Sequence, residues 1–255
     1  MSGTLAVIGL GPGQASQVTP EALEAVATAS NLFGYGPYLD RLTLQAGQRR
    51  HASDNREELS RAEAALTLAA SGSNVAVVSG GDPGVFAMAA AVCEAIENGP
   101  PAWRAIDIRI VPGVTAMLAV AARLGAPLGA DFCTISLSDN LKPWELIEHR
   151  LGAAAKAGFV IALYNPISRA RPWQLGRAFA LLGECLPPET LVIFGRAAGR
   201  PDERLAVTTL AEADPAKADM ATCVIIGSSE TRKIERGALP PLVYSPRSSS
   251  GALSR

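Results

Sequence analysis

The sequence has few of the residues that build metal centres and disulfides. Its 255 residues include four cysteines and only two histidines, His51 and His149, which are far apart in the chain. The cysteines are Cys93, Cys133, Cys185 and Cys223. None belongs to a Cys-x-x-Cys pair, and each has apolar neighbours, which is typical of reduced core cysteines in a cytosolic protein. We therefore expect no metal site, no disulfide and a cytoplasmic location.

Long apolar runs and an excess of one charge are also missing. No apolar run approaches the ~20 residues of a membrane-spanning helix, and residues 1–18 lack the charged start and apolar core of a signal peptide. The chain has 23 basic and 24 acidic residues and no basic tract. These features predict that neither nucleic acid nor a membrane is a partner.

Lysine supplies only four of the basic residues, so arginine predominates. Because the guanidinium group binds carboxylates through a planar fork, this bias fits a small substrate with several carboxylates. A GC-rich genome explains the same bias without any ligand, and both explanations stay open.

Motifs that bind nucleotide phosphates are absent or broken. No Gly-x-x-x-x-Gly-Lys-Ser/Thr sequence occurs, which excludes a P-loop. The strand expected at 5–8 leads into a Gly-Leu-Gly-Pro-Gly turn at 9–13, but Gln14 occupies the third glycine position of the dinucleotide fingerprint and Pro12 stiffens the turn. No acidic residue closes the next strand, at 31–36. The sequence therefore disfavours NAD and FAD.

A second glycine-rich turn, at 79–88, lies between an expected buried strand at 75–78 and an expected helix at 87–98. Open α/β sheets bind ligands at turns that follow the carboxyl ends of strands. Gly80 and Gly81 let a ligand approach the backbone, and Asp82 offers two acceptors to an ammonium or hydroxyl group. A tight turn without a ligand is the alternative.

Other segments complete an alternating pattern of strands and helices. Thr19 is expected to cap a helix that has proline in its first turn, and Asp54 to cap another with Glu57 in the capping-box position. A strand at 106–111 leads into a third glycine turn at 112–116, for which an ordinary N-cap is the alternative.

The second half is richer in strands. We expect strands at 132–136, 159–164, 191–194, 207–210 and 222–226, and helices at 143–157 and 171–182. The predicted fold class is α/β, with one α/β domain over 1–112, a second over 113–244 and a ligand cleft between them. The serine-rich tail at 245–255 is expected to be disordered.

Four motifs taken together resemble those of the tetrapyrrole methylases, the class III S-adenosylmethionine-dependent methyltransferases. They are the turn at 9–13, Gly80-Gly81-Asp82-Pro83, the segment 111–116 and the stretch 219–227, in the family's order. The resemblance covers residues 3–240 and implies the family's fold, with its cofactor cleft between the two α/β domains.

Further segments resemble the branch of the family that methylates C17 of a precorrin and contracts its ring, in cobalamin biosynthesis. They are 54–58, 84–89, 131–139 with 143–145, and 163–166 with Ser168 and Arg171. Uroporphyrinogen methylases of the family carry Tyr-Asp-Arg after their second strand, with the aspartate proposed as a proton acceptor. This chain has Tyr35-Gly36-Pro37 there, so that role cannot be transferred.

The resemblance implies S-adenosylmethionine as methyl donor, S-adenosylhomocysteine as product, a tetrapyrrole substrate and a homodimer. The implied cofactor-binding residues are Gly80, Gly81, Asp82, Val85, Thr115, Ala116, Tyr164, Asn165, Ala197 and Thr222. Pro12 would face the tetrapyrrole, and Arg56 and Arg171 are candidates for binding its carboxylates. Asp139 is the candidate for proton transfer during ring contraction; an N-cap for the helix near Pro143 is the alternative.

Four other functions are considered. The nearest is the cobalt-containing counterpart of the same reaction. Methylation of a diphthamide precursor or of ribosomal RNA would share the fold, although the balanced charge disfavours RNA. A non-catalytic tetrapyrrole or nucleotide carrier would bind ligand without methyl transfer. A nicotinamide oxidoreductase conflicts with the broken fingerprint.

Overall fold

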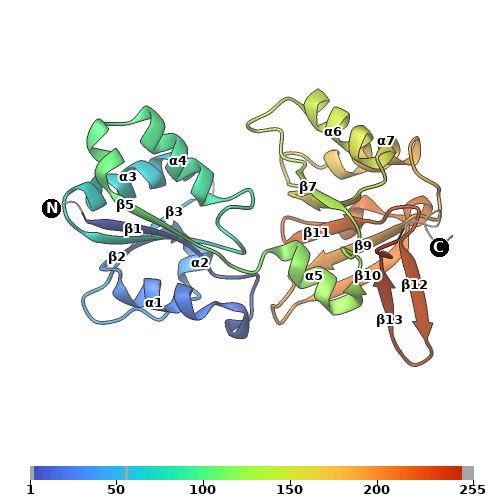
Figure 1. Cartoon of the computed structure of the whole chain (residues 1–255), viewed down its shortest axis with the longest axis horizontal. Coiled ribbons are helices and arrows are strands. Elements are labelled where there is room, and N and C mark those ends of the chain that lie inside the picture. Colours follow the sequence, from blue (N-terminus) through green and yellow to red (C-terminus); the bar gives the residue numbers. More distant parts are fainter. Residues whose placement is uncertain (1–2, 55–56, 249–255) are drawn as a thin grey trace. The chain divides into compact units, whose positions relative to one another are not determined.

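The computed structural model of the chain describes residues 3–54 and 57–248. The chain folds into two compact units (Figure 1). Unit 1 ends at Thr115 and unit 2 begins at Ala116. Within the described ranges, no helix combines the length and the apolar character needed to cross a bilayer.

Unit 1 is built on a five-stranded sheet in the order β3-β2-β4-β1-β5, with every neighbouring pair parallel. The strands are β1 (Thr4–Gly9), β2 (Asn31–Tyr35), β3 (Arg49–Ser53), β4 (Asn74–Ser79) and β5 (Asp107–Val111). The helices are α1 (Pro20–Thr28), α2 (Gly36–Leu39), α3 (Glu58–Ala70) and α4 (Met88–Asn98), with 3-10 turns at Ala15–Gln17 and Pro101–Ala105.

Helices cover both faces of this sheet (Figure 1). Successive residues of a strand point to opposite faces, so Val75 and Val77 of β4 pack with α3 and α4, whereas Ala76 and Val78 pack with α1 and α2. Burial on both faces explains why β4 is an uninterrupted apolar run in the sequence.

The helix starts in unit 1 test the capping predictions. Thr19 caps α1 as predicted, since its Oγ1 accepts a hydrogen bond from the Ala22 N–H at 3.1 Å. The prediction for α3 is wrong by three residues, because its N-cap is Glu57. Asp54 lies one turn earlier, where its N–H donates to Oε2 of Glu57 at 2.9 Å, which is the carboxylate half of the predicted capping box.

Unit 2 contains a mixed five-stranded sheet, β10-β9-β11-β8-β7, and a three-stranded sheet, β12-β13-β6. In the larger sheet β7 and β8 pair in parallel and the other pairs are antiparallel. The strands are β6 (Gly125–Ala126), β7 (Phe132–Ser136), β8 (Val160–Tyr164), β9 (Leu191–Arg196), β10 (Arg204–Thr209), β11 (Thr222–Ile226), β12 (Arg232–Arg236) and β13 (Leu239–Tyr244). The helices are α5 (Ala116–Leu124), α6 (Trp144–Lys156) and α7 (Gln174–Gly183), with 3-10 turns at Leu210–Glu212 and Pro215–Lys217.

The apolar core of unit 2 lies between the larger sheet and helices α6 and α7. Leu151 of α6, Leu175 of α7 and Ile161 of β8 are fully buried in it. On α5, Val120 approaches Gly195 of β9 so closely that a side chain at Gly195 would overlap it. The glycine therefore lets a helix lie directly against the sheet.

Two expectations for unit 2 are wrong. Helix α7 begins at Gln174, not at Arg171, because Pro172 disfavours helical backbone at the residue before it and Arg171 instead pairs with Ser168 in an isolated β-bridge. The expectation that residue 245 is disordered is also wrong, and residues 249–255 of the expected tail lie outside the described residues. Ser245 is buried, its N–H donates to the carbonyl of Ala126 at 3.0 Å, and its Oγ donates to the carbonyl of Pro127 at 2.7 Å.

Candidate functional site

Three glycine turns of unit 1 meet at one edge of its sheet. Strands β4, β1 and β5 are adjacent and parallel, so the turns that follow them lie side by side. The N–H of Gly11 donates to the carbonyl of Gly81 at 3.1 Å, and the N–H of Gly81 donates back to the carbonyl of Gly11 at 3.0 Å. The structure thus joins the turn at 9–13 to the turn at 79–88.

The contact is too close for side chains at two positions. A Cβ on Gly9 would lie 2.6 Å from the Gly81 carbonyl oxygen and 2.8 Å from the Gly113 nitrogen. A Cβ on Gly113 would overlap the Gly81 oxygen and lie 2.8 Å from that of Gly9. These glycines allow backbone to pack on backbone, so their role is to hold the three turns together.

Asp82 ties the second and third turns through its carboxylate. Oδ1 accepts the Gly84 N–H at 2.8 Å and Oδ2 accepts the Gly113 N–H at 3.0 Å. We expected both oxygens to face a ligand, whereas each has a backbone donor. A carboxylate oxygen has a second lone pair, so Asp82 can still accept from a ligand while it positions the turns.

Arg41 holds the first turn, and nothing in the sequence pattern singled it out. Its guanidinium donates to the carbonyls of Leu10 at 2.5 Å and Gly11 at 3.0 Å. Pro12, between these carbonyls and Gly13, is buried. The carbonyl oxygens of this turn thus point toward the positively charged guanidinium of Arg41.

Four of the cofactor candidates of unit 2 also share one edge of a sheet. Strand β8 ends at Tyr164, next to the start of the antiparallel β11, and β11 pairs Thr222 with Arg196 at the end of β9. Asn165 and Ala197 follow β8 and β9 directly, so the register brings Tyr164, Asn165, Ala197 and Thr222 together.

Each of these residues is held by a specific contact. The Tyr164 hydroxyl accepts the Met117 N–H, in the first turn of α5, at 3.0 Å. The Asn165 amide donates to Oγ of Ser136 at 2.9 Å. The Ala197 N–H donates to the carbonyl of Ala221 at 2.9 Å. Their side chains and backbone are therefore fixed before any ligand arrives.

Backbone strain marks both edges. Among the described residues, the non-glycine residues with positive φ are Phe86 at 52°, Asn165 at 50° and Ala197 at 50°. The left-handed region costs a side chain about 1–2 kcal/mol, and less for asparagine, which adopts it more readily. Such strain persists where the surrounding structure over-determines it, which is common at ligand sites.

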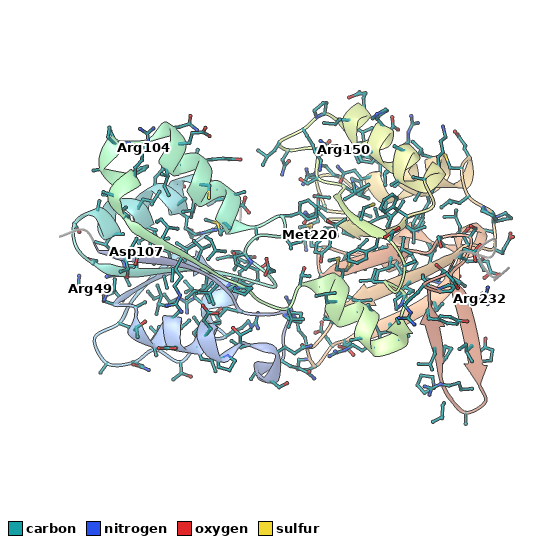
Figure 2. All side chains as sticks on the ribbon, viewed as in Figure 1. Arg49, Arg104, Asp107, Arg150, Met220 and Arg232 are labelled. Carbon is teal, nitrogen blue, oxygen red and sulfur yellow. The ribbon has the colours of Figure 1, made fainter. Side chains whose placement is uncertain are left out.

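Asp219 organises the turn that precedes β11. Its Oδ1 accepts from the Thr222 hydroxyl at 2.9 Å and its Oδ2 from Nε of Arg196 at 2.7 Å. Burial acts to raise the pKa of Asp219, but the hydrogen bonds from Arg196, Thr222 and the Ala221 N–H outweigh it and hold the pKa below its usual value. Met220, labelled in Figure 2, lies in this turn with 53% of its surface exposed.

Asp139 and Arg171 form a partly buried ion pair beyond the ends of β7 and β8. Nη1 of Arg171 donates to Oδ1 of Asp139 at 2.8 Å, and the Gln174 amide donates to the same oxygen at 2.9 Å. The bond from Arg171 is the main reason that the pKa of Asp139 lies below its usual value. Pro143, not Asp139, is the N-cap of α6, so the alternative role as a cap is wrong.

The remaining candidates are placed as follows. Gly80 and Val85 lie in the β4–α4 turn, where a Cβ on Gly80 would come within 2.7 Å of the Tyr38 ring. Thr115 is buried and Ala116 begins α5. Arg56 lies outside the described residues. In the described ranges, no group of three or more His, Cys, Asp or Glu could hold a metal ion.

The chain was then compared with known proteins. Residues 4–214 match the model of the Tetrapyrrole (Corrin/Porphyrin) Methylases. The chain belongs to this family. Its predicted α/β fold and its recognition as a tetrapyrrole methylase are therefore confirmed, and membership of this family disfavours the nicotinamide oxidoreductase.

Individual tetrapyrrole methylases are similar along nearly the whole chain. A Sinorhizobium protein named precorrin-3B C(17)-methyltransferase is 69% identical over 252 residues, 99% of each chain. A Salmonella typhimurium protein named probable cobalt-factor III C(17)-methyltransferase is 42% identical over 228 residues, 89% of this chain and 93% of the relative. A crystal structure of the methyltransferase CobJ matches this chain with a TM-score of 0.91 and 49% sequence identity. The match covers 96% of this chain and 100% of the CobJ chain.

Each sheet edge, taken by itself, carries polar groups that suit the donor of a tetrapyrrole methylase. These groups are hydroxyls, amides, backbone groups and the Asp82 carboxylate, so a ligand with an ammonium group and ribose hydroxyls can bond to them. In unit 1 the hydrogen-bonded glycine turns contain no lysine of the kind that a P-loop offers to a phosphate. This donor set fits S-adenosylmethionine, which has no phosphate.

Proposed function

We propose that this chain transfers a methyl group from S-adenosylmethionine to C17 of precorrin-3B, coupled to ring contraction to precorrin-4, in cobalamin biosynthesis. The observation that carries the proposal is the 69% identity, over 99% of both chains, to the precorrin-3B C(17)-methyltransferase of Sinorhizobium. The cobalt-containing substrate is disfavoured, because identity to the cobalt-factor III relative is only 42%.

The residues proposed to hold the donor are those at the two sheet edges. In unit 1 they are Gly80, Gly81, Asp82, Val85 and Thr115; in unit 2 they are Ala116, Tyr164, Asn165, Ala197 and Thr222. When bound, S-adenosylmethionine supplies a methyl group on a positively charged sulfur. The fixed contacts of Asp82, Tyr164 and Asn165 support a preorganised site, which lowers the cost of bringing donor and acceptor together.

Asp139 is proposed to orient the loops that follow β7 and β8 rather than to carry a proton. Its pKa is lowered, and one of its oxygens already accepts from Arg171 and Gln174. A carboxylate held as an anion is a poor general acid near neutral pH. This departs from the role expected from the sequence.

Arg171 remains our proposal for a residue that binds a substrate carboxylate. Nη1 is used by Ser138, Asp139 and Asn140, at 3.2, 2.8 and 2.7 Å, so recognition would fall to the other end of its guanidinium fork. Arg56 stays a second candidate. Pro12 is buried, so contact with the tetrapyrrole would come from the backbone of its turn.

A cytoplasmic homodimer is proposed on family resemblance alone. Multi-angle light scattering of the purified chain, whose mass is 26.4 kDa, distinguishes a dimer from a monomer directly. A single species of monomer mass would remove the dimer from the proposal.

The deciding experiment is an anaerobic incubation with methyl-labelled S-adenosylmethionine and either precorrin-3B or cobalt-factor III, followed by mass and absorbance spectra. A labelled, ring-contracted product from precorrin-3B is the expected result. Product from the cobalt compound alone would mean that the chain catalyses the cobalt-containing counterpart of the reaction. Binding of both ligands without methyl transfer would indicate a carrier.

A further inference from the structure

Two large apolar side chains are exposed in the loops that follow β7 and β8. Leu141 is 92% exposed and Trp173 is 46% exposed. Because β7 and β8 are adjacent and parallel, the loops at 137–143 and 165–173 leave the sheet at the same edge, where the cofactor candidates of unit 2 also lie. A single exposed leucine is ordinary on a protein surface. A leucine and a tryptophan exposed on neighbouring loops at a candidate ligand site instead point to a binding surface.

The two loops are locked together, so the exposed side chains are held by a fixed backbone. Nη1 of Arg171, in the second loop, donates to the side chains of three consecutive residues of the first loop, 138–140. The ring of Trp173 packs against that of Trp144, at the start of α6, with the ring centroids 4.8 Å apart and the ring planes at 76°. The Trp173 carbonyl accepts the Arg177 N–H, in the first turn of α7, at 3.0 Å. Little conformational entropy is therefore left to lose when a ligand binds.

Arg171 and Trp173 each keep a part of the side chain that can contact a ligand. The bonds that Arg171 makes to described residues come from Nε and Nη1, and no described residue accepts from its Nη2. The Arg171 side chain is 20% exposed. The ring of Trp173 contacts Trp144 and still leaves nearly half of the residue exposed. Two N–H donors and an aromatic surface are therefore offered by residues only two positions apart.

We propose that Trp173 and Leu141 form an apolar shelf that binds the face of the tetrapyrrole, while Nη2 of Arg171 binds a carboxylate at its rim. The inference rests on the proposed function. A tetrapyrrole combines an extended face of pyrrole-derived rings with several carboxylates, so a rigid aromatic surface and an arginine match its two parts. All three residues belong to unit 2, so the fold of that unit is enough to bring them together.

The test uses three substitutions in the shelf and one control. Trp173→Ala removes the ring, and Trp173→Phe keeps a smaller one. Leu141→Ser removes a side chain that is almost fully exposed, so it separates ligand binding from stability. The matched control is Phe132→Ala, since Phe132 is 40% exposed but begins β7, at the opposite end of the strand from the loop. For each protein we would measure KM for precorrin-3B, kcat, the Kd of S-adenosylhomocysteine by calorimetry, the melting temperature and the mass by light scattering.

We expect Trp173→Ala to raise KM for precorrin-3B about tenfold, the order of one lost aromatic contact, and Leu141→Ser to raise it about threefold. The values of kcat and of the Kd of S-adenosylhomocysteine should change less than about twofold, because the shelf binds the substrate rather than the donor. Trp173→Phe should recover most of the lost affinity. Leu141→Ser should melt like the wild type, and Phe132→Ala should keep the wild-type KM.

An unchanged KM in either Trp173→Ala or Leu141→Ser would overturn the inference. An equal weakening of S-adenosylhomocysteine would also overturn it, because the shelf would then bind the donor or support the whole unit. A lower mass of either variant in solution would instead assign these side chains to a contact between copies of the chain. Failure of the wild type to methylate precorrin-3B would refute the proposed function and, with it, the substrate of the shelf.

Discussion

At the level of single residues, the glycine turns of unit 1 depend on positions where no side chain fits. Gly9 and Gly113 pack backbone against backbone, and Asp82 bonds across the gap between two turns. These contacts are short and directional, so small chemical changes there should have large effects.

Gly113→Ala tests this packing. The added methyl group would overlap the Gly81 carbonyl oxygen, so we expect the free energy of unfolding to fall by about 2–3 kcal/mol. Urea denaturation measures the change. Gly183→Ala is the control, because a Cβ at this helical position would meet no described atom within 4 Å apart from its chain neighbours and the backbone of its own helix. Alanine there should stabilise by up to about 1 kcal/mol. Wild-type stability in Gly113→Ala would mean that the turns can separate without cost.

Asp139→Asn tests the ion pair with Arg171 through its pH dependence. Because the pKa of Asp139 is lowered in the folded chain, its stabilising effect is complete above the ordinary value of 3.8 and is lost as pH falls through the lower, folded value. We expect the variant to be less stable than wild type at pH 7 by up to about 1 kcal/mol. The difference should shrink below pH 3.8.

Unfolding curves at several pH values measure that difference, with Arg171→Gln as the reciprocal variant. A difference in the free energy of unfolding that grows toward low pH would contradict the assigned ion pair. Turnover should fall by less than tenfold if Asp139 only orients the loops, since general acid–base catalysis typically contributes 10²–10⁴-fold.

At the level of elements, caps and strand ends determine where the site residues lie. The β4–α4 turn is placed by a strand buried on both faces, and α1 is placed by its cap. The most accurate sequence predictions concern elements of this kind, in which local chemistry and burial agree. The edge strand β3 was missed, because its residues Arg49–Ser53 are polar or exposed and form no apolar run.

Thr19→Ala tests the cap of α1. Removing the Oγ1 that accepts the Ala22 N–H should lower the free energy of unfolding by about 1 kcal/mol. Thr19→Ser retains an acceptor and should stay within about 0.5 kcal/mol of wild type. If both variants lost stability equally, packing of the threonine methyl group rather than capping would be the cause.

At the level of the whole molecule, ligand binding should be visible as stability. A ligand that binds only the folded chain stabilises it by about 2.7 kcal/mol at a concentration 100 times its Kd. We expect S-adenosylhomocysteine at that concentration to raise the melting temperature by roughly 5–10 °C, as measured by scanning calorimetry.

The control for that shift is Asp82→Asn, which loses one acceptor for the Gly113 N–H or the Gly84 N–H and should show a smaller response to the ligand. NADH serves as a negative ligand. A melting temperature that rises with NADH but not with S-adenosylhomocysteine would contradict the proposed cofactor.

The sequence alone determined the α/β class, the glycine turns after β1, β4 and β5, and membership of the tetrapyrrole methylases, because these depend on local patterns and on motif order. The tertiary structure decided which atoms those motifs use. Strand order brings Gly11 to Gly81, and the register of β11 with β8 brings Tyr164 and Thr222 to one edge. Long-range contacts pair Arg41 with the first turn and Arg171 with Asp139. Such contacts join residues about 30 or more positions apart, so no local pattern specifies them; only the packed sheets do.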